Sequence, residues 1–287
     1  MIGVTGATGK LGRLAIAHLL TRRPARDIVA LVRHPERAKE MEDQGIKVRH
    51  ADYDAPASLG PALDGISKLL FISASEVGKR EPQHRALIDA AARARVGLIA
   101  YTSILRADSS RMKLVAEHKA TEGALRASGL PFVLLRHGWY IENYTENLAG
   151  PLATGTFIGS AGTGRIAAVT RADFAEADVR ALLDDGHAGK VYELANDTAF
   201  TMADLASTAS AWSGKPLAYR DLSPGEYAQA LTQFGVPGPY AEVLADCDLG
   251  VARGDLDVAS DDLRRLLGRP PRSLKDVLTN LPKPSAG

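Results

Sequence analysis

The first half of the chain alternates short apolar runs with amphipathic stretches, and no other feature of the sequence constrains the fold as strongly. Several of the runs have the length and the β-branched or aliphatic composition of strands. These runs are Ile2–Thr5, Ile28–Val32, Ile46–Val48, Leu69–Ile72, Leu98–Tyr101 and Phe132–Leu135. Helices are predicted between them, over Leu11–Leu19, Arg37–Met41, Ala57–Leu63, Pro82–Ala94 and Leu114–Ala127. Near-continuous apolar strands separated by helices predict an α/β fold with a doubly wound parallel sheet that helices cover on both faces.

A glycine-rich loop joins the first strand to the first helix. Its residues are Gly6, Ala7, Thr8, Gly9, Lys10, Leu11 and Gly12. Gly6 lets the chain turn tightly off the strand, Gly9 leaves the amides at the helix start uncovered, and Gly12 lets the helix lie close to the strand. In this context the loop predicts a Rossmann-type site for the pyrophosphate of a dinucleotide. Its GxxGxxG spacing is typical of short-chain dehydrogenases.

From about Trp139 the sequence changes to glycine-rich turns, short strands and capped helices. Strands are predicted at Phe157–Ile158, Ile166–Val169 and Val191–Leu194, and tail helices at Asp262–Leu267 and Leu274–Leu281. Thr170, Thr201 and Ser223 are each followed three residues later by Asp or Glu, the pattern of a capping box. We therefore expect a Rossmann domain over residues 1–138, to which strands near 166–169 and 191–194 return. Residues 139–287 would form a smaller, mostly helical substrate-binding region.

The end of the second strand indicates which dinucleotide is bound. An NAD site usually has Asp or Glu about 20 residues beyond the glycines, but here the strand ends in Arg33. A guanidinium can make a paired contact with the 2′-phosphate, so we expect NADPH; a solvated arginine is the alternative. Asp52 would lie beside the adenine, although a role in a turn fits almost as well. Ser73 and Ser75 follow the fourth strand, where the cofactor should cross the sheet.

The net charge and the cysteine content limit which partners and which cellular compartment we expect for the protein. Lys and Arg number 35 against 34 Asp and Glu, so a net charge of +1 gives no reason to expect a nucleic acid or an anionic membrane as partner. Met1 leads directly into an apolar strand, without the basic leader of a signal peptide. Cys247 is the only cysteine, which excludes an internal disulfide and a cysteine metal cluster. We expect a cytoplasmic protein without a metal, for which a homodimer is one option.

Several segments together resemble the NmrA-like, atypical short-chain dehydrogenase family. The similar segments are Ile2–Gly12, Ile28–Arg33, Gly45–Tyr53, Lys68–Gln83, Ala100–Ser103, Leu134–Tyr144 and Asp262–Val277. The stretches Phe71–Gly78 and Arg136–Tyr144 are specific to this family and not general to Rossmann folds. Within it, the chain is most similar to bacterial members that reduce quinones with NADPH, over essentially its whole length. Reductases of triphenylmethane dyes are near relatives on a similar scaffold.

The resemblance implies a set of cofactor contacts. These would come from Gly6 through Leu11, Arg33, Ser73, Ala74, Ser75, His137, Gly138, Trp139, Tyr140, Ile141 and Glu142. At His137 the family pattern has asparagine, so a contact by that side chain is not implied.

The catalytic pair of ordinary short-chain dehydrogenases is incomplete. Such enzymes place Tyr-x-x-x-Lys on the helix after the fifth strand, but here Val115 precedes Lys119. Hydride transfer to a quinone leaves a stable phenolate, which needs a proton donor less than an alkoxide does. Tyr140 and Asn143 are the first candidates for orienting the acceptor and stabilising that anion. His118 and Ser103 are second candidates.

Each candidate has a structural alternative. Tyr140 and Trp139 could simply pack a loop over the core. His118 could be exposed on a charged helix face, where Lys119 would pair with Glu117 or Glu122.

Three functions are consistent with these residues. The leading hypothesis is an NADPH:quinone oxidoreductase that transfers hydride directly to a small quinone-like substrate without flavin. The second is reduction of triphenylmethane dyes or other conjugated electrophiles. The third is a non-catalytic sensor of NADP(H) redox state, which the missing tyrosine favours; a sensor would bind cofactor and partner without turnover.

Overall fold

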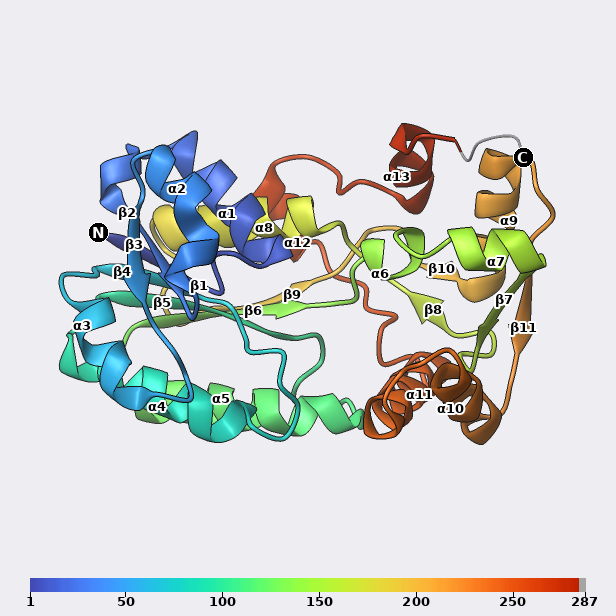
Figure 1. The fold of residues 1–287 in the computed structure, drawn as a ribbon, viewed down its shortest axis with the longest axis horizontal. Coiled ribbons are helices and arrows are strands. Elements are labelled where there is room, and N and C mark those ends of the chain that lie inside the picture. The colour runs from blue at the N-terminus through green and yellow to red at the C-terminus, as the bar shows by residue number, and fades with distance from the viewer. Residues whose placement is uncertain (284–287) are drawn as a thin grey trace.

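A seven-stranded parallel sheet lies at the centre of the computed structural model, which describes residues 1–283 (Figure 1). Its strand order is β3-β2-β1-β4-β5-β6-β9. The bounds are β1 Ile2–Thr5, β2 Ile28–Val32, β3 Lys47–His50, β4 Lys68–Phe71, β5 Leu98–Ile104, β6 Phe132–His137 and β9 Val191–Leu194. The chain starts in the middle, moves outward through β2 and β3, and then returns to continue on the other side of β1. This is the doubly wound order that the sequence predicted.

Helices cover both faces of this sheet (Figure 1). On one face lie α1 (Lys10–Leu20), α2 (Lys39–Asp43), α8 (Arg171–Leu183) and α12 (Asp262–Leu267). On the other face lie α3 (Leu59–Leu63), α4 (Arg80–Arg93) and α5 (Lys113–Ala127). Each face has its own cluster of buried apolar side chains. Short 3₁₀ turns at Ala25–Asp27, Pro35–Ala38 and Pro56–Ser58 complete the connections.

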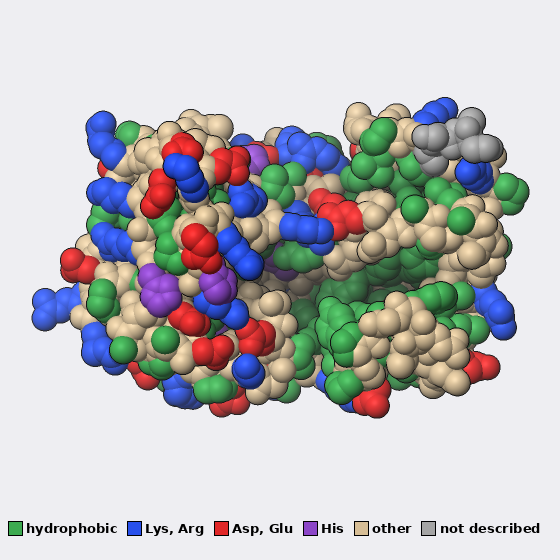
Figure 2. Space-filling view, in the orientation of Figure 1, with side chains coloured by type: hydrophobic (Ala, Val, Ile, Leu, Met, Phe, Trp, Pro, Cys, Tyr) green, Lys and Arg blue, Asp and Glu red, His purple; other side chains and the backbone are tan. Residues whose placement is uncertain are grey.

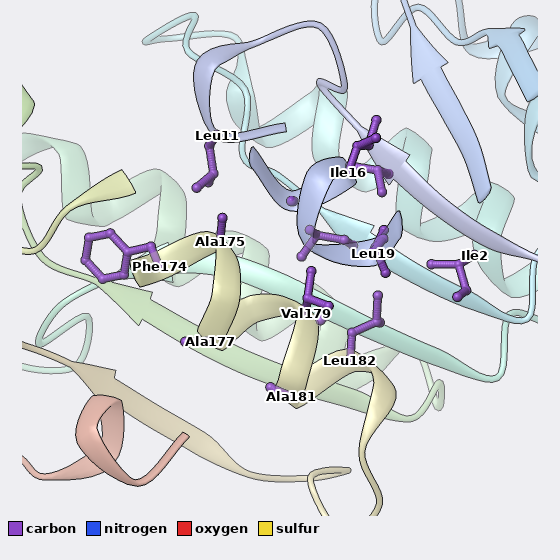
Figure 3. Close-up of a cluster of buried hydrophobic side chains, with 14 of the residues drawn as sticks. Ile2, Leu11, Ile16, Leu19, Phe174, Ala175, Ala177, Val179, Ala181 and Leu182 are labelled. Atoms are coloured by element: carbon purple, nitrogen blue, oxygen red, sulfur yellow. The ribbon is translucent and has the colours of Figure 1, made fainter. Parts of the chain in front are cut away.

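Helix α8 comes from the second half of the chain but packs into the first layer of helices. Ala175 and Val179 lie close to the α1 side chains Leu11 and Leu19 (Figure 3). Small side chains on α8 allow the two helices to approach closely. The layer that holds the glycine loop is therefore completed by residues that lie beyond residue 138.

The second half also builds two small sheets. Strands β7 (Thr156–Gly159) and β11 (Ala218–Asp221) pair in parallel, while β8 (Arg165–Ile166) and β10 (Phe200–Thr201) pair antiparallel. Around them lie α6 (Glu142–Thr145), α7 (Ala149–Thr154), α9 (Met202–Ser213), α10 (Pro224–Gln233), α11 (Gly238–Ala252) and α13 (Leu274–Asn280). Apart from α10, which has no buried residue, these elements contribute to or pack against a separate apolar core.

Of the two strands expected to return to the central sheet, only one does. Strand β9 pairs with β6, but β8 ends at Ile166 and belongs to a separate sheet, so the prediction for residues 166–169 is wrong. The amide of Ala167 instead donates to the carbonyl of Leu256, and its carbonyl accepts from the amide of Asn196. Val169 makes an isolated bridge to Tyr140. Apolar periodicity marks this segment as buried but does not identify its partner.

The predicted helix caps are largely present. Thr201 and Ser223 form reciprocal capping boxes at α9 and α10. Thr170 caps α8 by accepting from the Asp173 amide, but the Asp173 carboxylate pairs with Arg269 and Arg272 on the C-terminal tail. No helix within residues 1–283 is both long and apolar enough to cross a membrane.

Candidate functional site

The turn from β1 into α1 requires glycine for its backbone conformation at Gly6 and for space at Gly12. Gly6 has a φ of +58°, in the left-handed region that favours glycine. A Cβ on Gly12 would lie 2.3 Å from the carbonyl oxygen of Gly6 and 2.8 Å from the Cα of Ala7. Gly9 begins α1 without a side-chain cap, and the first turn carries no acidic residue. The helix therefore presents uncapped amides and the positive end of its dipole, which fits the pyrophosphate of a dinucleotide.

Arg171 and Glu146 link the glycine loop to the two predicted catalytic residues. The Lys10 ammonium lies 2.6 Å from Glu146, which also pairs with Arg171 at 2.9 Å. Arg171 donates to Oδ1 of Asn143 at 3.0 Å, and its guanidinium carbon lies 4.7 Å from the centre of the Tyr140 ring. Arg171 thus contacts both residues, Tyr140 just before α6 and Asn143 within it. The sequence analysis missed Arg171, which carries no motif of its own.

The Tyr140 side chain packs against apolar neighbours and keeps a hydroxyl that can donate a hydrogen bond. Its ring lies against the apolar core and meets Phe174 edge-to-face at 5.5 Å. Burial and the nearby Asp178 carboxylate raise the pKa of Tyr140 well above its ordinary value. The hydroxyl is therefore protonated at neutral pH and can donate a hydrogen bond. Trp139 is half-buried and packs against the core of the second half. This is the packing role that we considered as the alternative for this residue.

The side chain of His137 is buried and faces α8. Its Nε2 lies 2.8 Å from Oδ1 of Asp178 on α8, and its ring stacks on Phe174 at 4.0 Å. Both polar side chains are buried. A contact from His137 to a cofactor would therefore have to come from its backbone.

Arg33 lies at the carboxyl end of β2 with half of its side chain exposed. Its Nη2 is 2.9 Å from Oε1 of Glu76, and its Nε is 3.9 Å from Oδ1 of Asp52. Asp52 also accepts from the amide of Asp54, which is the turn role considered for it. The guanidinium is at the position from which we expected it to bind the 2′-phosphate. In this structure it faces two carboxylates.

Polar side chains of β5 and α4 hold the backbone of Ser73 and Ala74 in place. The Ser73 amide donates to Oγ1 of Thr102, and the Ala74 amide donates to Nε2 of His84, at 2.9 and 3.0 Å. Burial lowers the pKa of His84 to about 3, so the ring is neutral and can accept this bond. Arg80 donates to the carbonyl of Ala74. The sequence analysis missed His84 and Arg80, which belong to no recognised motif of α4.

Two residues considered for catalysis belong to buried networks instead. His118 is buried and its Nδ1 lies 2.9 Å from the Tyr101 hydroxyl, so the expectation of an exposed histidine is wrong. Ser103 donates to Glu122 at 2.6 Å, and Glu122 pairs with the buried Arg136.

The two carboxylates expected to pair with Lys119 have other partners. Glu122 is held by Arg136, and Glu117 pairs with Arg80 at 3.0 Å.

A groove runs beside α6 and α7 (Figure 2). Figure 2 shows apolar side chains along it, between α6 and α7 on one side and α10 and α11 on the other. Across the part of the chain that the structure describes, no group of three or more His, Cys, Asp or Glu side chains could hold a metal ion. The site therefore combines a dinucleotide cradle with an adjoining apolar surface.

Known proteins share this arrangement. Residues 6–185 match the NAD(P)H-binding family. Quinone oxidoreductase 2 of Escherichia coli (strain K12) is 48% identical over 281 residues, covering 98% of each chain. Its crystal structure with NADPH superposes with a TM-score of 0.95, covering 97% of this chain and 99% of that one.

Two further relatives extend the likeness. The Citrobacter sp. triphenylmethane reductase, solved with NADP(H), has a TM-score of 0.94 at 38% identity, covering 97% of this chain and 99% of that one. An NmrA-like family domain-containing oxidoreductase of Aspergillus flavus is 30% identical, covering 97% of this chain and 94% of that protein. The chain therefore belongs to the NAD(P)H-binding, NmrA-like family.

Proposed function

We propose that the protein is an NADPH-dependent oxidoreductase that reduces quinones by direct hydride transfer, without flavin. The observation that carries this proposal is the 48% identity, over nearly the whole chain, to a quinone oxidoreductase solved with NADPH. The geometry of the glycine loop and of Arg33 supports it. Residues 1–138 form the cofactor-binding part together with α8 and β9. Most of the other elements after residue 138 form the substrate-binding region. We place the enzyme in the cytoplasm, without a nucleic-acid or membrane partner.

The residues of the chain have separate tasks in this reaction. Bound NADPH supplies the hydride. The amides that open α1 bind the pyrophosphate, and Arg33 binds the 2′-phosphate. The loop at Ser73–Ser75 and the segment from His137 to Glu142 position the nicotinamide end. These contacts fix the distance between donor and acceptor, which is the main contribution that a protein can make to a hydride transfer.

Tyr140 and Asn143 act on the acceptor. The protonated Tyr140 hydroxyl donates to the quinone oxygen on which negative charge develops, while the Asn143 amide helps to orient the ring. Arg171 positions both side chains through the contacts described above. Hydride and one proton convert a quinone to a hydroquinone. The proton need not be delivered during hydride transfer, because the phenolate product is a weak and stable base compared with an alkoxide, and water can supply it afterwards.

The apolar groove favours a second candidate activity, the reduction of triphenylmethane dyes. Such dyes are large, flat and conjugated, and the Citrobacter relative is named for reducing them. Hydride addition to their central carbon requires no proton donor, so the absence of the ordinary catalytic tyrosine at Val115 is no obstacle.

One assay separates these functions from that of a sensor. Purified protein is mixed with NADPH and 1,4-benzoquinone, and the loss of NADPH absorbance is followed, with NADH as a donor control and a triphenylmethane dye as a second acceptor. Rapid loss with the quinone, and much slower loss with NADH, is the expected result. Tight NADPH binding without turnover on either acceptor would overturn the enzyme proposal and favour the sensor.

A further inference from the structure

Arg33 belongs to a cluster of two cations and two carboxylates, which are Arg33, Lys79, Glu76 and Asp52. Glu76 lies at its centre, with Oε1 2.9 Å from Nη2 of Arg33 and Oε2 3.1 Å from Nζ of Lys79. Asp52 lies on the other side of the guanidinium, with Oδ1 3.9 Å from Nε. The hydrogen bonds from Lys79 and Arg33 lower the pKa of Glu76, so the carboxylate is charged at neutral pH. As a whole the cluster carries no net charge, although Arg33 is the proposed partner of an anion.

The carboxylate of Glu76 and a 2′-phosphate require the same donors. A phosphate monoester carries about −1.5 to −2 charges at neutral pH and has three strong acceptor oxygens. It therefore competes with Glu76 for Nη2 of Arg33 and is repelled by the carboxylate while Glu76 remains there. A 2′-hydroxyl has no such conflict, because a carboxylate beside the ribose is the group that accepts from it in NAD sites.

We infer that Glu76 limits the preference for NADPH over NADH, because its carboxylate must be displaced from Arg33 by the 2′-phosphate but not by the 2′-hydroxyl. This inference rests on the proposed function only in assuming that Arg33 binds the 2′-phosphate. Glu76 acts against the preference that Arg33 creates, and Lys79 becomes a second cation for the phosphate once Glu76 has turned away.

The segment that carries Glu76 is anchored mainly at its two ends, and in its middle only the Glu76 carbonyl is bonded, at 3.3 Å to the Lys79 amide. Ser73 and Ala74 are anchored by Thr102 and His84, and Glu117 accepts from the amide of Gly78.

Between these anchors, the amides of residues 75–77 have no hydrogen-bond partner among the described residues. The side chain of Glu76 is 30% exposed and that of Arg33 is 50% exposed, so their ion pair is screened by water. An exposed pair of this kind shifts an equilibrium by about two- to fivefold. Displacement of Glu76 is thus a local and inexpensive rearrangement.

The test compares Glu76→Gln with the wild-type protein and with Glu81→Gln, an exposed acid at the start of α4 that makes no ion pair among the described residues. Dissociation constants for NADPH and NADH are measured at low ionic strength by titrating the fluorescence of the reduced nicotinamide. 2′,5′-ADP, measured by calorimetry, is a probe that carries the 2′-phosphate without the nicotinamide.

We expect Glu76→Gln to bind NADPH and 2′,5′-ADP about two- to fivefold more tightly. NADH should bind with unchanged or lower affinity, and Glu81→Gln should match the wild type. In an Arg33→Gln background, most of the gain from Glu76→Gln should disappear, because the competition takes place on the guanidinium.

Equal or weaker binding of NADPH by a folded Glu76→Gln protein would overturn the inference, as would an equal gain for NADH. In either case Glu76 would merely hold Arg33 in place. A wild-type protein that does not prefer NADPH to NADH would instead contradict the proposed role of Arg33. The two failures are therefore distinguishable.

Discussion

His137 and Asp178 form a hydrogen bond that is sealed between β6 and α8. Nε2 of His137 lies 2.8 Å from Oδ1 of Asp178, and the imidazole stacks on Phe174 with an interplanar angle of 5°. Nδ1 of His137 and Oδ2 of Asp178 are buried without a partner among the described residues. Burial raises the pKa of Asp178, and the nearby His137 opposes that rise. Among residues 1–283, each of the two side chains is therefore the other's single hydrogen-bond partner and offsets its loss of water.

Removing His137 should destabilise the protein without removing a cofactor contact. His137→Phe leaves the Asp178 carboxyl buried and unpaired, so we expect the free energy of unfolding to fall by about 3–5 kcal/mol. The dissociation constant of NADPH should change little, because the imidazole faces α8. Denaturant unfolding and cofactor titration measure the two quantities. The double variant His137→Phe/Asp178→Leu should recover part of the loss, and a single variant as stable as the wild type would contradict the assigned role.

Adding one carbon at Gly12 of the glycine loop should weaken cofactor binding. The Cβ of Gly12→Ala would overlap the carbonyl of Gly6, and backbone atoms on both sides cannot yield. We expect NADPH affinity to fall by at least about tenfold and the melting temperature to drop. Gly60→Ala in α3 is the matched control, because its Cβ would meet no atom within 4 Å. Retention of wild-type affinity by Gly12→Ala would show that α1 does not need to approach β1 so closely.

Removing the Arg33 guanidinium should discriminate between the two cofactors. A charge-assisted hydrogen bond to phosphate is lost in Arg33→Gln, so NADPH binding should weaken by about tenfold to a hundredfold. NADH binding should remain within about twofold, because its 2′-hydroxyl makes no use of the charge. Titration of both cofactors provides the measurement and its internal control. A parallel loss for both would indicate that Arg33 supports the loop and does not bind phosphate.

The Tyr140 hydroxyl should matter for turnover and not for cofactor binding. With Tyr140→Phe the ring still packs on Phe174 and beneath Arg171, but the donor to the quinone oxygen is gone. We expect kcat to fall by about tenfold to a hundredfold, with an unchanged NADPH dissociation constant. Tyr240→Phe, on an exposed part of α11, is the control. An unchanged kcat for Tyr140→Phe would assign the residue to packing alone.

The pH dependence of stability should reveal Asp248. Its carboxylate accepts from the amide of Ser160, and burial raises its pKa from 3.8 to about 6. Because the folded state favours the protonated form, this group contributes stability at low pH that is lost as pH rises from about 4 through about 6. Asp248→Asn should therefore melt a few degrees above the wild type at pH 8, with a smaller difference at pH 5.

Asp204 is the matched control, since the capping amide and hydroxyl of Thr201 lower its pKa. Its contribution has the opposite sign: it is present at neutral pH and is lost as pH falls through the depressed pKa. Asp204→Asn should be less stable than the wild type at pH 8, and the difference should shrink in acid. If the two variants responded to pH in the same direction, the burial of Asp248 would not be what raises its pKa.

The strands and the cofactor loop could be predicted from the sequence because local properties determine them. An apolar run such as Ile28–Val32 indicates a buried strand whatever its neighbours are, and the helix stripe that begins at Leu11 indicates which face is covered. The capping boxes at Thr201 and Ser223 depend on residues only three positions apart. The strand at β8 was harder, since burial alone did not distinguish the central sheet from a small separate one.

The amino-acid sequence by itself determined the doubly wound α/β fold, the glycine loop and the presence of a cation at the end of β2, because periodicity and backbone sterics act over a few residues. Only the tertiary structure decided how the polar side chains are used. Arg33 and Glu76 are 43 positions apart, and His137 and Asp178 are 41 positions apart. Such pairs form only when the folded sheet and its helices bring distant charges out of water together, so no local pattern in the chain predicts them.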